Sequence, residues 1–167
     1  MKYIQTITIT RKDLIELYKL LNSLQLPSDV NAKFTYGLYK NITLIQPEID
    51  ALRTIMIEDQ QIDEFEQKRL ELCNQYAQKD ENGNPIIQNN EFIIDNIEEF
   101  TNKFKELETQ YKDVLEKNKQ KIQEINNILN EEIEQPIYCL DLNTIPNGIG
   151  LKEMKYLSLL IKNEEDV

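Results

Sequence analysis

The sequence predicts a mainly α-helical fold with a small β component: a long antiparallel helical hairpin plus a small terminal sheet covered by short helices. Three observations support this fold class. Apolar residues recur at helical spacing from Asn96 to Ile133, with no Pro or Gly between them. A second helical segment, Pro47 to Lys79, precedes that stretch, and turn-forming residues separate the two. Both ends of the chain carry a β-like run, at residues 2–9 and 137–142.

We expect a single helix from Asn96 to Ile133. Its 38 residues would extend roughly 57 Å at about 1.5 Å per residue, far longer than a small globular core requires. We therefore expect it to lie antiparallel against the Pro47–Lys79 helix, with Leu107 near the middle of the seam. The apolar positions on its buried face would be Ile97, Phe100, Phe104, Leu107, Tyr111, Val114, Ile122, Ile125, Leu129 and Ile133.

The N-terminal part of the chain is predicted to be a strand followed by two helices. Residues 2–9 alternate in a pattern that suits a pleated surface, and Thr10 can cap a helix over residues 11–23. Ser28 is a good cap for the next helix, whose apolar seam crosses Pro47. Because proline removes an amide donor and clashes with the carbonyl four residues earlier, we expect a kink or a break there. The seam residues are Phe34, Leu38, Ile42, Ile45, Ile49, Leu52 and Met56.

Residues 80–95 are predicted to form the tip of the helical hairpin. The run from Asp80 to Pro85 is the strongest turn-forming stretch in the chain. Two short apolar runs, Ile86-Ile87 and Phe92-Ile93-Ile94, follow it and are typical of a small β-hairpin.

The C-terminal part is predicted to return to the N-terminal strand. Residues 137–142 form a strand that pairs with residues 2–9, and Leu151 to Lys162 form a last helix over the sheet. The whole chain, 1–167, is expected to be one domain from which residues 47–133 protrude as the helical hairpin.

The net charge of −11 is unevenly distributed. Residues 1–47 carry a net charge of +3, whereas residues 48–81 and residues 91–134 each carry −6. The predicted helical arm is thus the acidic part, and nucleic acid and anionic membranes would repel it. We expect no direct binding to nucleic acid or to a membrane. Neither an apolar run of about 18 residues nor a signal-peptide core is visible, so a cytoplasmic location is expected.

The sequence offers little catalytic chemistry. It contains no histidine, which is the usual general base and zinc ligand. No GxxxxGK phosphate-binding loop is present, and Gly148-Ile149-Gly150 lacks the third glycine of a dinucleotide site. Cys73 and Cys139 have no CxxC spacing and are expected to be buried thiols. We therefore predict a non-enzymatic protein without a cofactor or a metal.

Paired carboxylates are the metal-binding alternative. Helical nucleotide pyrophosphohydrolases hold magnesium with acidic residues one turn apart on facing helices. No acidic pair in this chain has a facing pair three residues apart in the required register, so solvated helix faces are the favoured interpretation. The candidates are Glu98 and Glu99; Asp63 and Glu64 with Glu66; and Glu131 and Glu132 with Glu134.

Four stretches have a familiar pattern: Lys33 to Asn41 (KFTYGLYKN), Gln46 to Leu52, Tyr76 to Pro85, and the Ile145-Pro146 step before the last helix. Together with the order of elements, they resemble a family of small uncharacterised bacteriophage and prophage helical proteins over most of the chain. The family has no established activity, so the resemblance implies no catalytic residue. It does imply a phage context and the cytoplasm of a host cell.

Two groups of residues are candidates for binding a partner. The first is acidic and lies on the long helix: Glu98, Glu99, Glu106 and Glu108. The second is a partly exposed polar-aromatic patch beside Asn41 that would suit a protein or a nucleotide. Its members are Lys33, Tyr36, Tyr39 and Lys40.

The favoured function is that of a phage-encoded anti-defence protein whose partner is a host or phage protein. It would inhibit a host defence nuclease, or another nucleic-acid-handling complex, by presenting acidic surface where nucleic acid would bind. An alternative from a different class is a structural or assembly protein that self-associates as a coiled coil through exposed seam residues. The third alternative is a carboxylate-metal nucleotide hydrolase.

Overall fold

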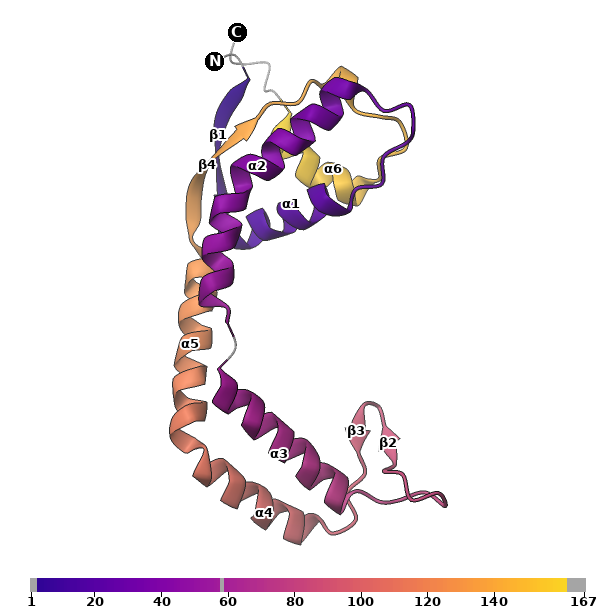
Figure 1. The fold of residues 1–167 in the computed structure, drawn as a ribbon, viewed down its shortest axis with the longest axis vertical. Coiled ribbons are helices and arrows are strands. Elements are labelled where there is room, and N and C mark those ends of the chain that lie inside the picture. The colour runs from indigo at the N-terminus through magenta and orange to yellow at the C-terminus, as the bar shows by residue number, and fades with distance from the viewer. Residues whose placement is uncertain (1–2, 58, 162–167) are drawn as a thin grey trace. The chain divides into compact units, whose positions relative to one another are not determined.

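The computed structural model describes residues 3–57 and 59–161 (Figure 1). These residues form mainly helices together with small antiparallel sheets, which confirms the predicted fold class. The chain divides into two compact units. We call Met1–Met56 with Ile125–Val167 the terminal unit, and Ile57–Glu124 the middle unit.

The sheet of the terminal unit joins the two ends of the chain. Strand β1 (Ile4–Thr10) pairs antiparallel with β4 (Glu132–Tyr138), so the predicted pairing is confirmed. The predicted bounds of the second strand, 137–142, were wrong, because the strand begins at Glu132 and runs through Pro136 to Tyr138. Pro136 lies opposite Thr6, with its backbone on the side of β4 that does not pair with β1, where the missing amide breaks no ladder hydrogen bond.

Among the described residues, three α-helices lie wholly within the terminal unit. They are α1 (Arg11–Ser23), α2 (Ala32–Ile55) and α6 (Leu151–Leu157), with short 3₁₀ turns at Leu142–Thr144 and Ser158–Leu160. Helix α1 contacts β1, α2 contacts β4, and α6 packs against α1. Thr10 caps α1 as predicted, its side chain accepting a hydrogen bond from the Asp13 amide at 3.1 Å. The cap of α2 is Asn31 and not Ser28, with the Lys33 amide as donor. The last helix is shorter than predicted, and Lys162 lies outside the described residues.

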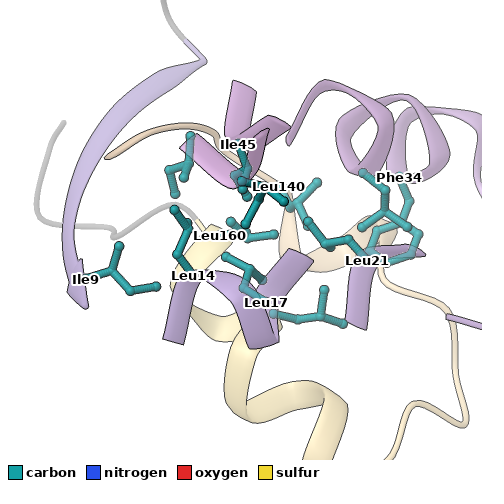
Figure 2. Packing of buried hydrophobic residues seen from close by; sticks show 12 residues of the cluster. Ile9, Leu14, Leu17, Leu21, Phe34, Ile45, Leu140 and Leu160 are labelled. Carbon is teal, nitrogen blue, oxygen red and sulfur yellow. The ribbon is translucent and has the colours of Figure 1, made fainter. Parts of the chain in front are cut away.

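The core of the terminal unit lies between these helices and β4 (Figure 2). The apolar stripe of α1 and the first half of the α2 seam both point into it. The part of this seam beyond Pro47 was expected to belong to the helical hairpin, but Ile49 lies in this core. The buried residues of this core are Ile9, Leu14, Leu17, Leu21, Phe34, Leu38, Ile45, Ile49, Ile137, Leu140, Leu157 and Leu160.

Helix α2 passes through Pro47 without ending there, so of the two expected outcomes at this residue, a kink or a break, the break was wrong. Pro47 is exposed, and its missing amide therefore weakens the helix on the side where water can replace it. The helix ends at Ile55 instead. The next helix begins at Gln60 behind the Asp59 cap, whose carboxylate accepts from the Gln61 amide at 2.9 Å.

Two antiparallel helices pack against each other in the middle unit. Helices α3 (Gln60–Tyr76) and α4 (Ile97–Gln110) meet along an aromatic seam. The rings of Phe65 and Tyr111 lie 5.6 Å apart at one end, and the rings of Tyr76 and Phe100 lie 6.1 Å apart at the other.

A small hairpin connects α3 to α4. Strand β2 (Ile87–Gln88) pairs with β3 (Glu91–Phe92). The two residues between them, Asn89 and Asn90, have φ angles of 52° and 66°. Two successive left-handed residues match the twist of a two-residue hairpin turn, and asparagine tolerates that conformation well.

The predicted helix from Asn96 to Ile133 is interrupted. Helix α4 ends at Gln110, α5 (Lys112–Asn130) follows, and Ile133 belongs to β4. The interruption is at Tyr111, whose ring packs on Phe65 and whose hydroxyl lies 2.8 Å from the Lys68 ammonium. Leu107 is buried on α4 as predicted, but none of the α5 residues, all of which the structure describes, is fully buried. The predicted apolar face is therefore half-exposed beyond Tyr111.

Candidate functional site

The polar-aromatic patch of Lys33, Tyr36, Tyr39 and Lys40, which we call the tyrosine patch, lies on the first turns of α2. Phe34, Gly37, Leu38 and Asn41 point inward at steps of three and four, and this leaves the intervening side chains on the surface. Tyr36 and Tyr39 retain 51% and 66% of their exposure. All four patch residues therefore lie on the outer side of the same helix.

The structure adds two tyrosines that the sequence interpretation missed. The ring of Tyr138 meets the edge of Tyr36 at 5.8 Å and stacks on Tyr3 at 5.7 Å. Because Ile4 pairs with Tyr138, Tyr3 and Tyr138 lie at the same end of the sheet. The register of β1 against β4 would have predicted that Tyr3 and Tyr138 are neighbours. That register could be derived from the sequence only with the correct bounds of β4.

A cavity of about 430 Å³ lies beside these rings. Of the four predicted patch residues, Lys33 and Tyr36 line it, whereas Tyr39 and Lys40 do not. The Lys40 ammonium instead lies 5.5 Å from the centre of the Tyr36 ring. The lining consists of Tyr3, Ala32, Lys33, Tyr36, Tyr138, Cys139, Leu140, Asp141 and Thr144. Such a surface can hold an aromatic or apolar group by stacking, with one cation at its rim.

Asn41 is a structural residue. Its side chain is fully buried, and its amide nitrogen donates to the carbonyls of Tyr138 (2.9 Å) and Gly37 (3.0 Å). Its amide oxygen accepts from the Tyr138 N–H at 2.8 Å. A side-chain amide thus takes the place of a neighbouring strand along β4. Gly37 permits this close approach, because a Cβ atom there would overlap the Leu140 side chain.

The second candidate surface is the acidic part of the middle unit. This unit contains 17 acidic and nine basic side chains, a net charge of −8. Glu98 and Glu108 are exposed and form no hydrogen bond or ion pair with any residue that the structure describes. Their carboxylates are therefore available to a partner.

The other two predicted glutamates have partners of their own. The Glu99 carboxylate accepts from Asn96 at 3.0 Å and from the Tyr76 hydroxyl at 2.9 Å, and this second bond raises the pKa of Tyr76. Glu106 pairs with Lys103 at 2.9 Å, which raises the pKa of Lys103. Glu99 is thus part of the α4 cap and of the seam with α3.

The four glutamates do not share one narrow face of α4. At about 100° per residue, Glu99 and Glu106 lie about 20° apart around the helix, but Glu108 lies about 180° from Glu99. A single stripe would require steps of three, four or seven residues. The four side chains therefore form a broad acidic surface.

Each group of carboxylates considered for a metal has at least one member engaged with another side chain, as shown above for Glu99. Glu66 pairs with Arg69 at 2.8 Å, Glu131 pairs with Arg11 at 2.6 Å, and Glu134 accepts from the Thr8 hydroxyl at 2.9 Å. Within residues 3–57 and 59–161, no group of three or more His, Cys, Asp or Glu side chains is placed to hold a metal ion. Over the same ranges, none of the helices is both long and apolar enough to cross a membrane.

Comparisons with known protein families, with curated proteins and with solved structures gave no match. The function is therefore inferred from the residues and their geometry.

Proposed function

We propose that the protein is a non-enzymatic, phage-encoded binding protein that inhibits a nucleic-acid-handling protein of the host, such as a defence nuclease. The middle unit would occupy the surface where nucleic acid binds. The observation that carries this proposal is the charge distribution, since the middle unit holds −8 of the net charge of −11. The phage context comes from the sequence resemblance, and the host cytoplasm is the location it implies.

Charge of this kind favours a basic partner. A nucleic-acid-binding groove is lined with lysine and arginine, and it attracts a dense acidic surface over a Debye length of about 8–10 Å. The same charge repels nucleic acid itself. Exposed carboxylates without partners among the described residues, such as Glu98 and Glu108, lose no intramolecular bond when they meet such a groove.

Removing those two charges tests the proposal. Glu98→Gln with Glu108→Gln keeps side-chain size and helix propensity nearly unchanged. The control, Asp29→Asn with Glu132→Gln, removes two exposed charges from the terminal unit instead. Each immobilised protein is exposed to nuclease-treated host lysate at low and at high salt, and the retained proteins are quantified.

We expect the middle-unit variant to retain less of its partner than the control does at low salt, with the difference shrinking at high salt. Equal retention by both variants at both salt concentrations would contradict binding through this surface.

The tyrosine patch is the second candidate binding surface, because three aromatic rings and Lys33 surround a cavity. Tyr36→Ala removes one ring from it without touching the core. If this variant loses the retained protein and the glutamine variant does not, the partner binds the tyrosine patch.

A further inference from the structure

The two edges of the terminal sheet differ. In the ladder, the Cys139 N–H donates to the Tyr3 carbonyl at 2.8 Å, and the Arg11 N–H donates to the Glu131 carbonyl at 3.2 Å. Because hydrogen-bonded pairs alternate in an antiparallel ladder, the backbone groups of the odd-numbered residues of β1 face β4. Those of the even-numbered residues point away from β4, along the outer edge of β1. These residues are Ile4, Thr6, Thr8 and Thr10.

The outer edge of β4 is blocked at Pro136 and Tyr138. Asn41 occupies both the N–H and the carbonyl of Tyr138. Pro136 has no N–H to offer, and its carbonyl accepts from the Gln135 side chain at 2.8 Å. Proline and side-chain caps of this kind are the usual means of preventing a further strand from pairing.

The described residues give the outer edge of β1 no such protection. None of them hydrogen-bonds to the backbone groups of Thr6 or Thr8 on that side. The strand, IQTITIT, contains no charged residue and no proline, and the side chains of Thr6 and Thr8 are exposed. Figure 2 shows the Ile9 side chain pointing from β1 into the core, so packing fixes one face of the strand.

We propose that this edge is an interface between two copies of the chain. Strand β1 would pair antiparallel with β1 of the second copy, giving a continuous four-stranded sheet in the order β4-β1-β1′-β4′. A twofold axis at Ile7, the midpoint of Ile4–Thr10, pairs the whole strand with the same strand of the second copy. Thr6 then lies opposite Thr8 of the second copy, and Ile7 lies opposite Ile7.

Three features favour a second copy over a strand of another protein. The outward-pointing residues are symmetric about Ile7, so each donor meets an acceptor of the same strand in the other copy. The seven residues carry no charge, so no like charges face each other. The pairing also closes on itself, because the edges left over from the described strands of this sheet are the outer edges of β4, which are blocked at Pro136 and Tyr138. Strand β1 is part of neither the predicted coiled-coil seam nor the acidic middle unit.

Sedimentation equilibrium tests the interface. We expect the wild-type chain to approach twice its mass of 19.8 kDa as its concentration rises. Thr6→Lys with Thr8→Lys places lysines opposite each other across the axis and should leave a monomer. Thr35→Lys with Thr43→Lys makes the same change of composition and charge on exposed positions of α2 and should remain dimeric.

A cysteine at the axis gives a second, independent readout. The Ile7→Cys side chain would face its own copy at a Cα separation of about 4.5 Å, within the range that a disulfide spans. We expect rapid intermolecular crosslinking, with the disulfide between the two copies of position 7 identified by mass spectrometry. Gln5→Cys is the control. Its two copies would lie about 13 Å apart along the strands and should not crosslink with each other.

A wild-type chain that stays at 19.8 kDa over the whole concentration range would overturn the proposal. It would do so even if β1 were then found to bind a strand of another protein. Identical behaviour of the two lysine variants would also overturn the proposal. If circular dichroism shows that the Thr6 and Thr8 lysine variant is unfolded, the two cysteine variants decide. Crosslinking of Gln5→Cys as readily as Ile7→Cys would then reject the pairing.

Discussion

Asn41 shows how a single polar residue fixes the packing of a helix on a strand edge. It lies in the seam of α2 between Leu38 and Ile45, at the same spacing as the apolar residues. A polar residue at a seam position was visible in the sequence, but its partner Tyr138 is 97 positions away and could not be derived from local pattern. Asn41 therefore borders the exposed patch in the sequence but lies in the core of the folded unit.

Asn41→Leu should lower the free energy of unfolding by about 2–4 kcal/mol, because it leaves the N–H and carbonyl of Tyr138 buried without partners. Urea unfolding followed by circular dichroism measures this. Asn102→Leu, at an exposed position of α4, is the control and should change stability by less than about 0.5 kcal/mol. Equal effects of the two substitutions would mean that the buried amide contributes little.

Asp80 organises the turn that follows α3. Its carboxylate accepts from the amides of Asn84 (2.8 Å) and Asn82 (2.9 Å), and chiefly the Asn84 amide lowers the pKa of Asp80. Since the folded pKa lies below the unfolded one, this stabilisation is present above the ordinary value of about 3.9 and is lost as pH falls through the folded pKa. A carboxyl titration by NMR should have its midpoint below about 3.9. A midpoint at or above that value would show that the turn does not hold the charged form.

The sequence predicted the type of each helix and strand better than the residues at which it begins and ends. The errors at Pro47, at Tyr111 and at Glu132 have a common cause. In each case the local sequence pattern predicted one place for an element to begin or end, but a tertiary contact or solvent exposure determined the observed place. Tyr111 is on the predicted apolar period, yet its contacts with Phe65 and Lys68 accompany the end of α4.

Leu107→Asp tests the pairing of α3 with α4. Leu107 is the buried residue of α4, and a carboxylate there opens a cavity and buries an unpaired charge, at a cost of roughly 3–5 kcal/mol. The thermal midpoint by circular dichroism should fall markedly. Ile122→Asp, at a side chain of α5 that is 49% exposed, should have a much smaller effect. An unchanged midpoint for Leu107→Asp would contradict the packing of these helices.

For the molecule as a whole, the pairing of the chain ends holds the terminal unit together. The N-terminal strand is linked through β4 to the 3₁₀ turn that follows α6, since the Leu140 N–H beyond β4 donates to the Leu160 carbonyl at 2.7 Å. Deleting residues 1–9 should therefore lower amide-exchange protection in α6. Unchanged protection of Leu151–Leu157 after the deletion would show that α6 is held without β1.

The candidate binding surfaces were predictable only in part. Lys33 and Tyr36 were identified from their position off the seam, but Tyr3 and Tyr138 required the strand register. The acidic character of the middle unit follows from the sequence alone. Which of its glutamates lack partners among the described residues does not, because Asn96 and Tyr76 reach Glu99 only in the folded unit.

Displacement by DNA tests most directly whether the acidic middle unit occupies a nucleic-acid site. Host proteins retained by the immobilised wild-type chain are challenged with duplex DNA and, in parallel, with an uncharged peptide nucleic acid duplex of the same length. We expect duplex DNA to release the retained partner and the uncharged duplex to leave it bound, because a competitor for a basic groove must be anionic. A partner that stays bound in excess duplex DNA would contradict occupation of a nucleic-acid site by the middle unit.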